Sequence, residues 1–98
     1  MLEELTRKIE EAVSKKTAFG FNVRFDLDDG ESIYVQAKSE PVKVSSAKDP
    51  ADTVFKVSET NLDAMLDGKL SPMSAYITGK MKIEGDMSKA MQLSSLFG

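Results

Sequence analysis

The chain has 98 residues, of which 41% are hydrophobic, and it carries a formal net charge of −3. A chain of this length supports one hydrophobic core, so we expect a single domain over residues 1–98. Its thirteen Lys and Arg residues are interleaved with sixteen Asp and Glu residues. This balance argues against a general nucleic-acid-binding protein, which needs a basic stripe, and gives no support for polybasic attraction to an anionic membrane.

Cysteine and histidine are both absent. Their absence excludes thiolate catalysis, disulfides, zinc sites of the Cys/His kind and serine nucleophiles activated by histidine. Only carboxylates, Lys and Tyr remain for acid–base work, so we expect no enzyme, no catalytic residue, no metal and no cofactor. No stretch approaches the ~18 apolar residues of a membrane span, and the N-terminus lacks a signal-peptide pattern. We therefore expect a cytoplasmic protein with at most transient membrane contact.

The first predicted elements are a helix and a strand. Apolar residues at helical spacing from Leu2 to Val13 predict an amphipathic helix over residues 2–16. Its mixed, Glu-rich polar face favours packing on a sheet over binding at a membrane surface. Alternation with a period of two predicts a half-buried strand over residues 19–28, and Asp29-Gly30 then predicts a hairpin turn.

Three further strands are expected before residue 58. The pattern places them at residues 32–38, 41–46 and 53–57, with a turn at residues 48–52. The first four strands follow one another through short connections. We therefore expect a meander, in which each strand pairs with the next one along the chain.

The C-terminal third predicts short helices around one more strand. Ser58 is a predicted N-cap for a helix over residues 59–66, and Ser71-Pro72 opens a second helix that Gly79 ends. Residues 80–84 alternate as a fifth strand, and Asp86 caps a last helix that reaches Phe97. The sequence thus predicts an α+β fold, a five-stranded mostly antiparallel sheet with helices packed on one face.

Two motifs suggest ion or phosphate binding and fail on spacing. The acidic cluster Asp26, Asp28, Asp29 and Glu31 offers oxygen ligands, but a calcium loop would need a ligand where Gly30 stands, so a solvated hairpin end is expected. The pairs Gly68-Lys69 and Gly79-Lys80 lack the remaining residues of a phosphate loop and are better explained as helix ends. Tyr76 and Lys80 could form an acid–base pair, but nothing supplies a charge partner that would tune either group.

Residues 62–97 hold five of the six methionines. Methionine is unbranched and polarisable, so a surface lined by it suits apolar guests of variable shape. Methionines at helical spacing also serve as ordinary core residues. From the residues alone, both interpretations stay open.

The same segment resembles the sterol carrier protein type 2 family. A string of Gly-Lys turns, small residues and methionines carries the resemblance, namely Ala64-Met65-Leu66, Gly68-Lys69-Leu70, Pro72, Ser74-Ala75-Tyr76, Gly79-Lys80-Met81-Lys82-Ile83, Gly85-Asp86-Met87, Ala90-Met91 and Leu93. This close match covers about a third of the chain, and the preceding strands agree with the family in layout only.

The resemblance implies a sheet covered by helices around an apolar cavity. The cavity would bind a sterol, fatty acid, acyl-CoA ester or other lipid, without chemistry on the ligand. Carried over, the wall would consist of apolar side chains from the C-terminal third: Met65, Leu66, Met73, Tyr76, Ile77, Met81, Ile83, Met87 and Met91. The sheet would supply a floor at Phe25 and Val35.

One alternative function fits the same residues. On the same fold, the methionines could face a protein partner or a second copy of the chain, with no lipid ligand. Many family members continue beyond the position of Gly98 and fold a tail over the cavity. From the resemblance we therefore expect a cavity that is open, collapsed or closed by a second subunit in a homodimer.

Overall fold

A computed structural model of the protein describes residues 2–14 and 19–93. The elements follow the order expected from the sequence: α1 (Leu2–Ser14), β1 (Phe21–Asp26), β2 (Ser32–Ala37), β3 (Lys43–Ser45), β4 (Thr53–Val57), α2 (Glu59–Leu66), α3 (Pro72–Ile77), β5 (Met81–Gly85) and α4 (Met87–Gln92). The strands β1, β2 and β3 are one or two residues shorter than expected at an end, β4 has the expected bounds, and β5 is shifted by one residue. The predicted ends of the first helix, at residues 15 and 16, and of the last, at residues 94–97, lie outside the described residues.

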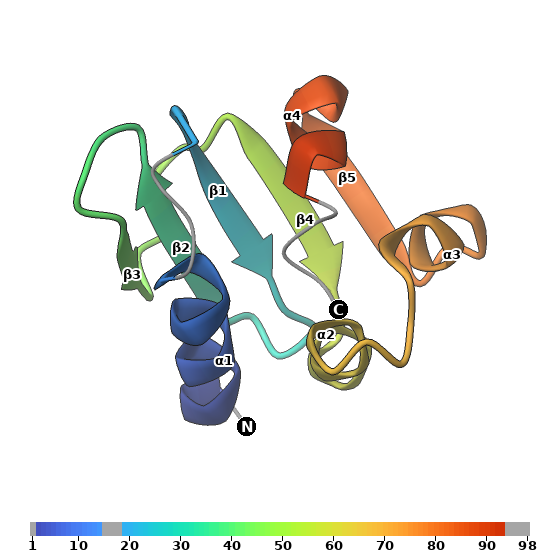
Figure 1. Ribbon diagram of the computed structural model, residues 1–98. Helices are drawn as coiled ribbons and strands as arrows, with labels where there is room; N and C mark the ends of the chain where they lie inside the picture. The colour runs from blue at the N-terminus through green and yellow to red at the C-terminus, as the bar shows by residue number, and fades with distance from the viewer. Residues whose placement is uncertain (1, 15–18, 94–98) are drawn as a thin grey trace.

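The described strands form one five-stranded sheet in the order β3-β2-β1-β4-β5. Three of the neighbouring pairs are antiparallel, and β1 and β4 are parallel. Helices α1 to α4 lie on one side of this sheet (Figure 1). The predicted α+β class, with a mostly antiparallel sheet and helices on one face, is therefore confirmed.

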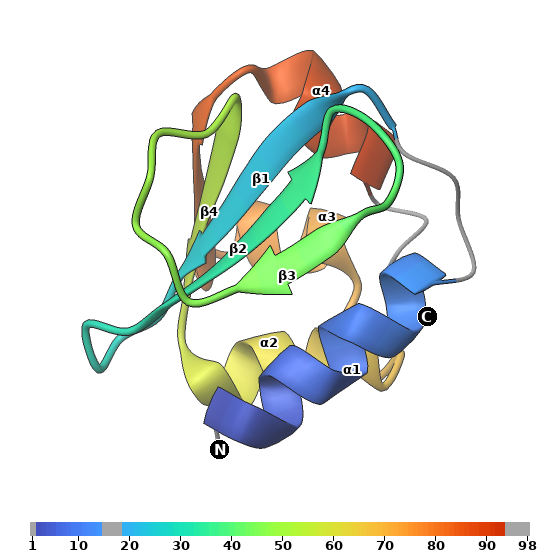
Figure 2. The ribbon, with the colours of Figure 1, turned by 90° about the vertical axis from the view of Figure 1, so that its left-hand side faces the viewer.

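The predicted meander is wrong at its fourth strand. Instead of pairing with β3, the strand β4 lies beside β1, which it joins in parallel with Phe25 opposite Phe55. Residues 46–52 make the crossover, and they run along the side of the sheet opposite the helices (Figure 2). The short connection between β3 and β4 suggested that these two strands would pair as a hairpin. Local sequence does not reveal which strands become neighbours in a sheet.

Hydrogen bonds from the outer face of the sheet hold this crossover in place. The Tyr34 hydroxyl donates to the carbonyl of Pro50 at 2.8 Å and accepts from the side-chain amide of Asn22 at 3.0 Å. The backbone of Asn22 is bonded to Asp52 in both directions, through its N–H to the carboxylate and through its carbonyl to the Asp52 N–H. These polar partners explain why the segment crosses this face, where its backbone groups find partners.

The helix side of the sheet carries the core. The rings of Phe25 and Phe55 stack on neighbouring strands with their centroids 5.2 Å apart. Helix α1 covers the β3 side of this surface and buries one apolar stripe, formed by Leu5, Ile9 and Val13. Lys8, on its adjacent face, donates to the carboxylates of Asp63 and Asp67 and so connects α1 to the α2 region. As expected, α1 packs in the fold through its apolar face.

Helices α2 and α3 end at glycines in the same way. Gly68 and Gly79 have φ of 76° and 78°, and the next residues, Lys69 and Lys80, donate backward to carbonyls of the preceding helix. This arrangement of a left-handed residue and backward hydrogen bonds caps the free carbonyls of a helix end. The two Gly-Lys pairs are therefore helix ends, as predicted from their spacing. Among the described residues, no helix combines the length and the hydropathy needed to cross a membrane.

Candidate functional site

Large apolar side chains are exposed on α3 and α4. Within the described residues, those that the structure leaves open to solvent are Ile77 (72%), Met73 (51%), Met91 (48%), Tyr76 (43%) and Met87 (40%). The two helices sit at opposite ends of the edge strand β5 (Figure 1). We call these five residues the α3–α4 apolar surface.

Helix α3 presents its apolar side to solvent. Ser71 caps it by accepting a hydrogen bond from the N–H of Ser74, and Pro72 occupies its first turn. Met73, Tyr76 and Ile77 are spaced i, i+3 and i+4, so they share one side of the helix. The fully buried residue of α3 is the small Ala75, and α3 contacts β5. A helix that buries an alanine and exposes larger apolar residues is unusual, since amphipathic helices normally bury their apolar stripe.

Helix α4 divides its apolar residues between the core and solvent. Asp86 caps it by accepting from the N–H of Lys89 at 3.1 Å. Ala90 is buried, whereas Met87 and Met91, spaced i and i+4, are exposed. Within β5, Ile83 is partly buried on the helix side of the sheet, opposite Phe55 of β4. This edge of the protein thus offers solvent-accessible apolar side chains from three successive elements.

The predicted wall and floor residues fall into three groups. Phe25, Val35, Met65 and Met81 are buried in the core, with at most 2% of each exposed. Leu66 and Ile83 are partly buried and pack against that core. The remaining five form the α3–α4 apolar surface. The predicted floor, Phe25 and Val35, is therefore covered by neighbouring side chains, whereas the wall residues on α3 and α4 are exposed to solvent.

Three hollows on the described part of the chain lie away from these residues. One, of about 330 Å³, lies between the end of α1 and β3 and is lined by Glu10, Val13, Ser14, Glu40, Val42 and Val44. A second, of about 310 Å³, is lined by residues that include Asn22, Gln36 and Lys43. Neither includes a predicted wall or floor residue. The lining of the second is largely polar or charged, and the lining of the first is half polar, whereas the pockets that small hydrophobic ligands occupy are mostly apolar.

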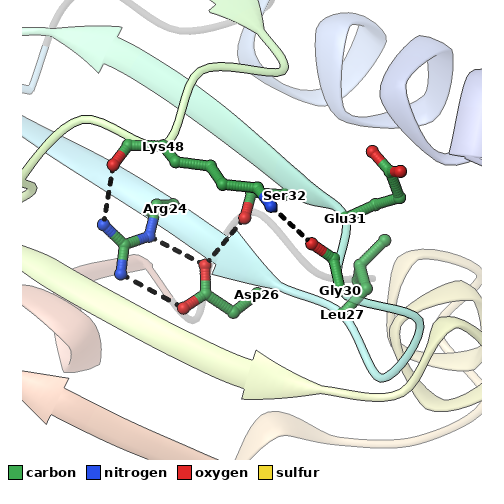
Figure 3. A pocket seen from close by; sticks show the side chains of 7 residues that line it. All are labelled: Arg24, Asp26, Leu27, Gly30, Glu31, Ser32 and Lys48. Carbon is green, nitrogen blue, oxygen red and sulfur yellow. Dashed lines mark hydrogen bonds and ion pairs between the residues drawn. The ribbon is translucent and has the colours of Figure 1, made fainter.

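A third hollow, of about 250 Å³, lies on the outer face of the sheet beside the crossover (Figure 3). Arg24 donates two hydrogen bonds to Asp26, at 2.7 and 3.1 Å, and a third to the carbonyl of Asp49 at 3.0 Å. Ser32 also donates to Asp26, and Lys48 donates to the carbonyl of Gly30. The side chains of Arg24, Asp26, Ser32 and Lys48 are thus already paired within the protein. This Arg24–Asp26 cluster therefore has a structural role, which is to hold the crossover in place.

The Arg24–Asp26 cluster should contribute to the stability of the protein in a way that depends on pH. Burial is the largest single influence on the pKa of Asp26 and by itself would raise it. The hydrogen bonds from Arg24 and Ser32, together with the positive charge of Arg24, outweigh burial, so the pKa of Asp26 is lowered. A lowered pKa in the folded state stabilises the protein above the unfolded value of about 3.9. This stabilisation is lost as pH falls through the lowered pKa.

Urea unfolding between about pH 2 and 6 should show that Asp26→Asn is less stable than the unsubstituted protein near pH 6. The difference from the unsubstituted protein should shrink toward pH 2, and a difference independent of pH would contradict this role.

Two other acidic residues of the predicted cluster, Asp28 and Asp29, accept hydrogen bonds within the protein. Asp29 accepts from the N–H of Glu31, and Asp28 accepts from the N–H of Glu59 at the start of α2. The described part of the chain holds no group of three or more acidic side chains arranged to bind a metal ion. These carboxylates therefore shape the β1–β2 turn and its contact with α2.

The mixed sheet, the helices on one side of it and the apolar residues around its last strand define the architecture of a sterol carrier domain. The chain belongs to the SCP-2 sterol transfer family, whose model matches residues 2–98. The solution structure of sterol carrier protein domain 2 of Helicoverpa armigera superimposes on it with a TM-score of 0.80 and 27% identity, covering 95% of this chain and 82% of that one. The resemblance stated from the C-terminal motifs is confirmed.

Curated relatives carry the matched region within longer proteins. The chain is 30% identical over 101 residues to hydroxysteroid dehydrogenase-like protein 2 of Bos taurus and 32% identical over 105 residues to sterol carrier protein 2 of Rattus norvegicus. These matches cover 97% and 98% of the chain but 24% and 19% of the two relatives. The chain thus spans about a fifth to a quarter of the length of these relatives.

Proposed function

We propose that the protein binds a hydrophobic ligand of the lipid kind at the α3–α4 apolar surface and carries it without chemical change. The observation that supports this proposal most is the exposure of five large apolar side chains around β5. Groups of exposed large apolar side chains often mark a binding site on a soluble protein. Membership of the SCP-2 sterol transfer family supports lipid binding or transfer in general terms.

The positions of the predicted residues suggest how a ligand is held. A lipid chain would first contact Met73, Tyr76, Ile77, Met87 and Met91, then Leu66 and Ile83 deeper in the fold. It would reach Phe25, Val35, Met65 and Met81 only if the helices moved away from the sheet, because these four are buried. A bound ligand is therefore proposed to open the helix layer and to replace core contacts with its own.

Burial of the ligand can supply the free energy for this opening. At about 0.8 kcal/mol per buried CH₂, a sixteen-carbon chain gains roughly 12 kcal/mol. Association and ordering cost at least about 4 kcal/mol, and separation of the helices adds to that. The balance leaves room for micromolar affinity. Selectivity between lipids should be low, because one methylene changes little and methionine side chains can repack.

A protein-interaction or dimerisation domain is the second candidate. The same exposed side chains would serve it, since apolar surface also marks protein interfaces. The two functions differ in what occupies the α3–α4 apolar surface. A partner or second copy would bury it without any lipid, and the protein would then form a dimer or complex at low concentration with no saturable fatty-acid binding.

We expect Met91→Trp to weaken the binding of a fluorescent fatty acid by about tenfold or more, because an indole would fill the space over β5 that the ligand needs. Met91 is 48% exposed, so the fold should tolerate the larger side chain. Gln92→Trp is the matched control, since it puts the same residue at the neighbouring exposed position of α4. Fluorescence titration and thermal unfolding of both variants give the comparison. Equal binding by Met91→Trp and the control would show that the wall is misplaced.

A further inference from the structure

We propose that the free edge of β5 is a homodimer interface, at which the β5 strands of two copies pair antiparallel around Ile83 and join their sheets. The strand β5, Met81–Gly85, is an edge of the sheet, and no described strand lies on its outer side. An unpaired strand edge is a template for another strand, and proteins usually protect such edges. The other edge strand, β3, is protected by its length of only three residues.

The backbone groups of every second residue of β5 point away from the sheet. In an antiparallel pair of strands, hydrogen-bonded and non-hydrogen-bonded residue pairs alternate. The N–H of Asp86 donates to the carbonyl of Asp52 at 3.0 Å, and these two residues continue the register of β4 with β5. Alternation from this pair directs the backbone groups of Lys82 and Glu84 toward β4. The outward-facing backbone groups are therefore those of Met81 and Ile83.

Side-chain charges select one register for the pairing of two copies. The backbone groups of directly opposite residues in antiparallel strands either face each other or both face away, so only every second register is allowed. If Lys82 or Glu84 lay on the two-fold axis, that residue would lie opposite its own copy, and like charges in directly opposite positions are destabilising. With Ile83 on the axis, Lys82 of each copy lies opposite Glu84 of the other. The sequence Lys82-Ile83-Glu84 is thus complementary to itself in this register.

Registers with the axis at either end of β5 bring like charges together as well. An axis at the first residue of the strand would put Lys80 opposite Lys82, and an axis at its last residue would put Glu84 opposite Asp86. The axis at Ile83 is therefore the one that the charges favour. It runs perpendicular to the sheet, so the helices of both copies lie on the same side of the joined sheets.

The side chains on both faces of β5 suit this pairing. Lys82 and Glu84 are exposed, and Glu84 forms an ion pair with Lys56 of β4 at 3.3 Å. In the dimer, the Glu84 carboxylate would lie between Lys56 of its own chain and Lys82 of the other. On the helix side, Ile83 is partly buried against the core and would lie beside Ile83 of the second copy. A lysine on an edge strand ordinarily discourages pairing, but here a glutamate two residues later supplies its partner in the second copy.

Charge reversal tests the register. Sedimentation velocity of the delipidated protein should show a dimer whose fraction rises with concentration between about 1 µM and 1 mM. Lys82→Glu and Glu84→Lys should each raise the dissociation constant of the dimer at least about tenfold, because each puts like charges opposite one another on both sides of the axis. An equimolar mixture of the two variants should form a heterodimer about as stable as the unsubstituted dimer, since opposite charges then face each other again. Lys43→Glu, on the edge strand β3, makes the same change in charge as Lys82→Glu and should leave the dimer unchanged.

Amide hydrogen exchange tests the pairing of the backbones. The N–H of Ile83 should exchange more slowly as the protein concentration rises, because at the axis it donates to the carbonyl of Ile83 in the other copy. The N–H of Glu84 faces β4 within one copy, so its exchange should not depend on concentration. A protein that stays monomeric over this concentration range, a mixture of the two charge variants that does not dimerise, or exchange at Ile83 that is independent of concentration would each overturn the proposal.

The dimer interface does not rest on the proposed function. It uses the edge of β5 rather than the α3–α4 apolar surface, and dimerisation is measured without lipid. Lys82 and Glu84 are not among the proposed ligand-contacting residues. A dimer that passes these tests but does not bind a fatty acid would support the interface and remove the proposed function. Fatty-acid binding by a protein that stays monomeric would do the reverse.

Discussion

Replacing Phe25 by alanine is expected to lower the free energy of unfolding by about 4 kcal/mol, the usual cost of removing a buried phenylalanine from a core. Phe25 is 1% exposed, and its ring stacks on that of Phe55 at 5.2 Å. Small domains are stable by about 5–15 kcal/mol, so this variant should have lost much of its stability at room temperature. Urea unfolding followed by circular dichroism measures the change.

Phe19→Ala provides the comparison for Phe25→Ala. The Phe19 ring lies 4.9 Å from that of Phe21 but is only partly buried, so its removal should cost about 1 kcal/mol. A loss below about 1 kcal/mol for Phe25→Ala would contradict the closed floor that the structure shows. The result bears on function because a ligand can reach Phe25 only by displacing the packing that this substitution measures.

Gly85→Ala is expected to destabilise the protein by about 2–5 kcal/mol, through a backbone collision and an unfavourable dihedral angle together. A Cβ at Gly85 would lie 2.5 Å from the carbonyl oxygen of Asp52 and 3.3 Å from the Cα of Thr53, and φ at this glycine is +87°. The Asp52 carbonyl also accepts from the N–H of Asp86, the cap of α4. The substitution should therefore displace the start of α4 as well as the end of β5.

Gly79→Ala separates the collision from the dihedral effect. Gly79 has a similar φ of +78°, but nothing lies within 4 Å of an added Cβ. It should cost only the left-handed strain of alanine, about 1–2 kcal/mol. Thermal and urea unfolding of the two variants should therefore differ clearly. Equal losses would show that the close approach of Asp52 to Gly85 is relieved without cost.

Local sequence signals predicted the elements well because their causes are local. Ser58, Ser71 and Asp86 each accept a hydrogen bond from the N–H three residues later, as expected of N-cap side chains. Alternation in β1 places Val23 and Phe25 on the core side, with intervening residues more exposed. These features depend on neighbours within a few residues, which a sequence displays directly.

Strand order could not be predicted because its causes are distant in the chain. The parallel pairing of β1 with β4 depends on a crossover whose partners, Asn22, Arg24 and Tyr34, precede it by 16 to 30 residues. In the local sequence, each of these polar residues looks like an ordinary strand residue that faces solvent. Their hydrogen bonds to the crossover become visible only when the sheet is assembled.

The residues of the proposed site were predicted as one set, but the structure separates them by depth. Short helices explain the difference. In α3, a periodic pattern of six residues cannot show whether Met73 and Ile77 or Ala75 will face the sheet, because apolar residues lie on both sides. The structure exposes the larger residues and buries the alanine. Their role in ligand binding stays a prediction.

The most direct test of lipid binding uses the methionines themselves. Methyl-labelled methionine gives one NMR signal for each residue, and titration with palmitate should shift the signals of Met73, Met87 and Met91 with a common saturable dependence. If the helix layer opens as proposed, the buried Met65 and Met81 should follow with the same midpoint. The absence of any saturable shift, with the protein folded throughout, would contradict the claim that the α3–α4 apolar surface binds a lipid.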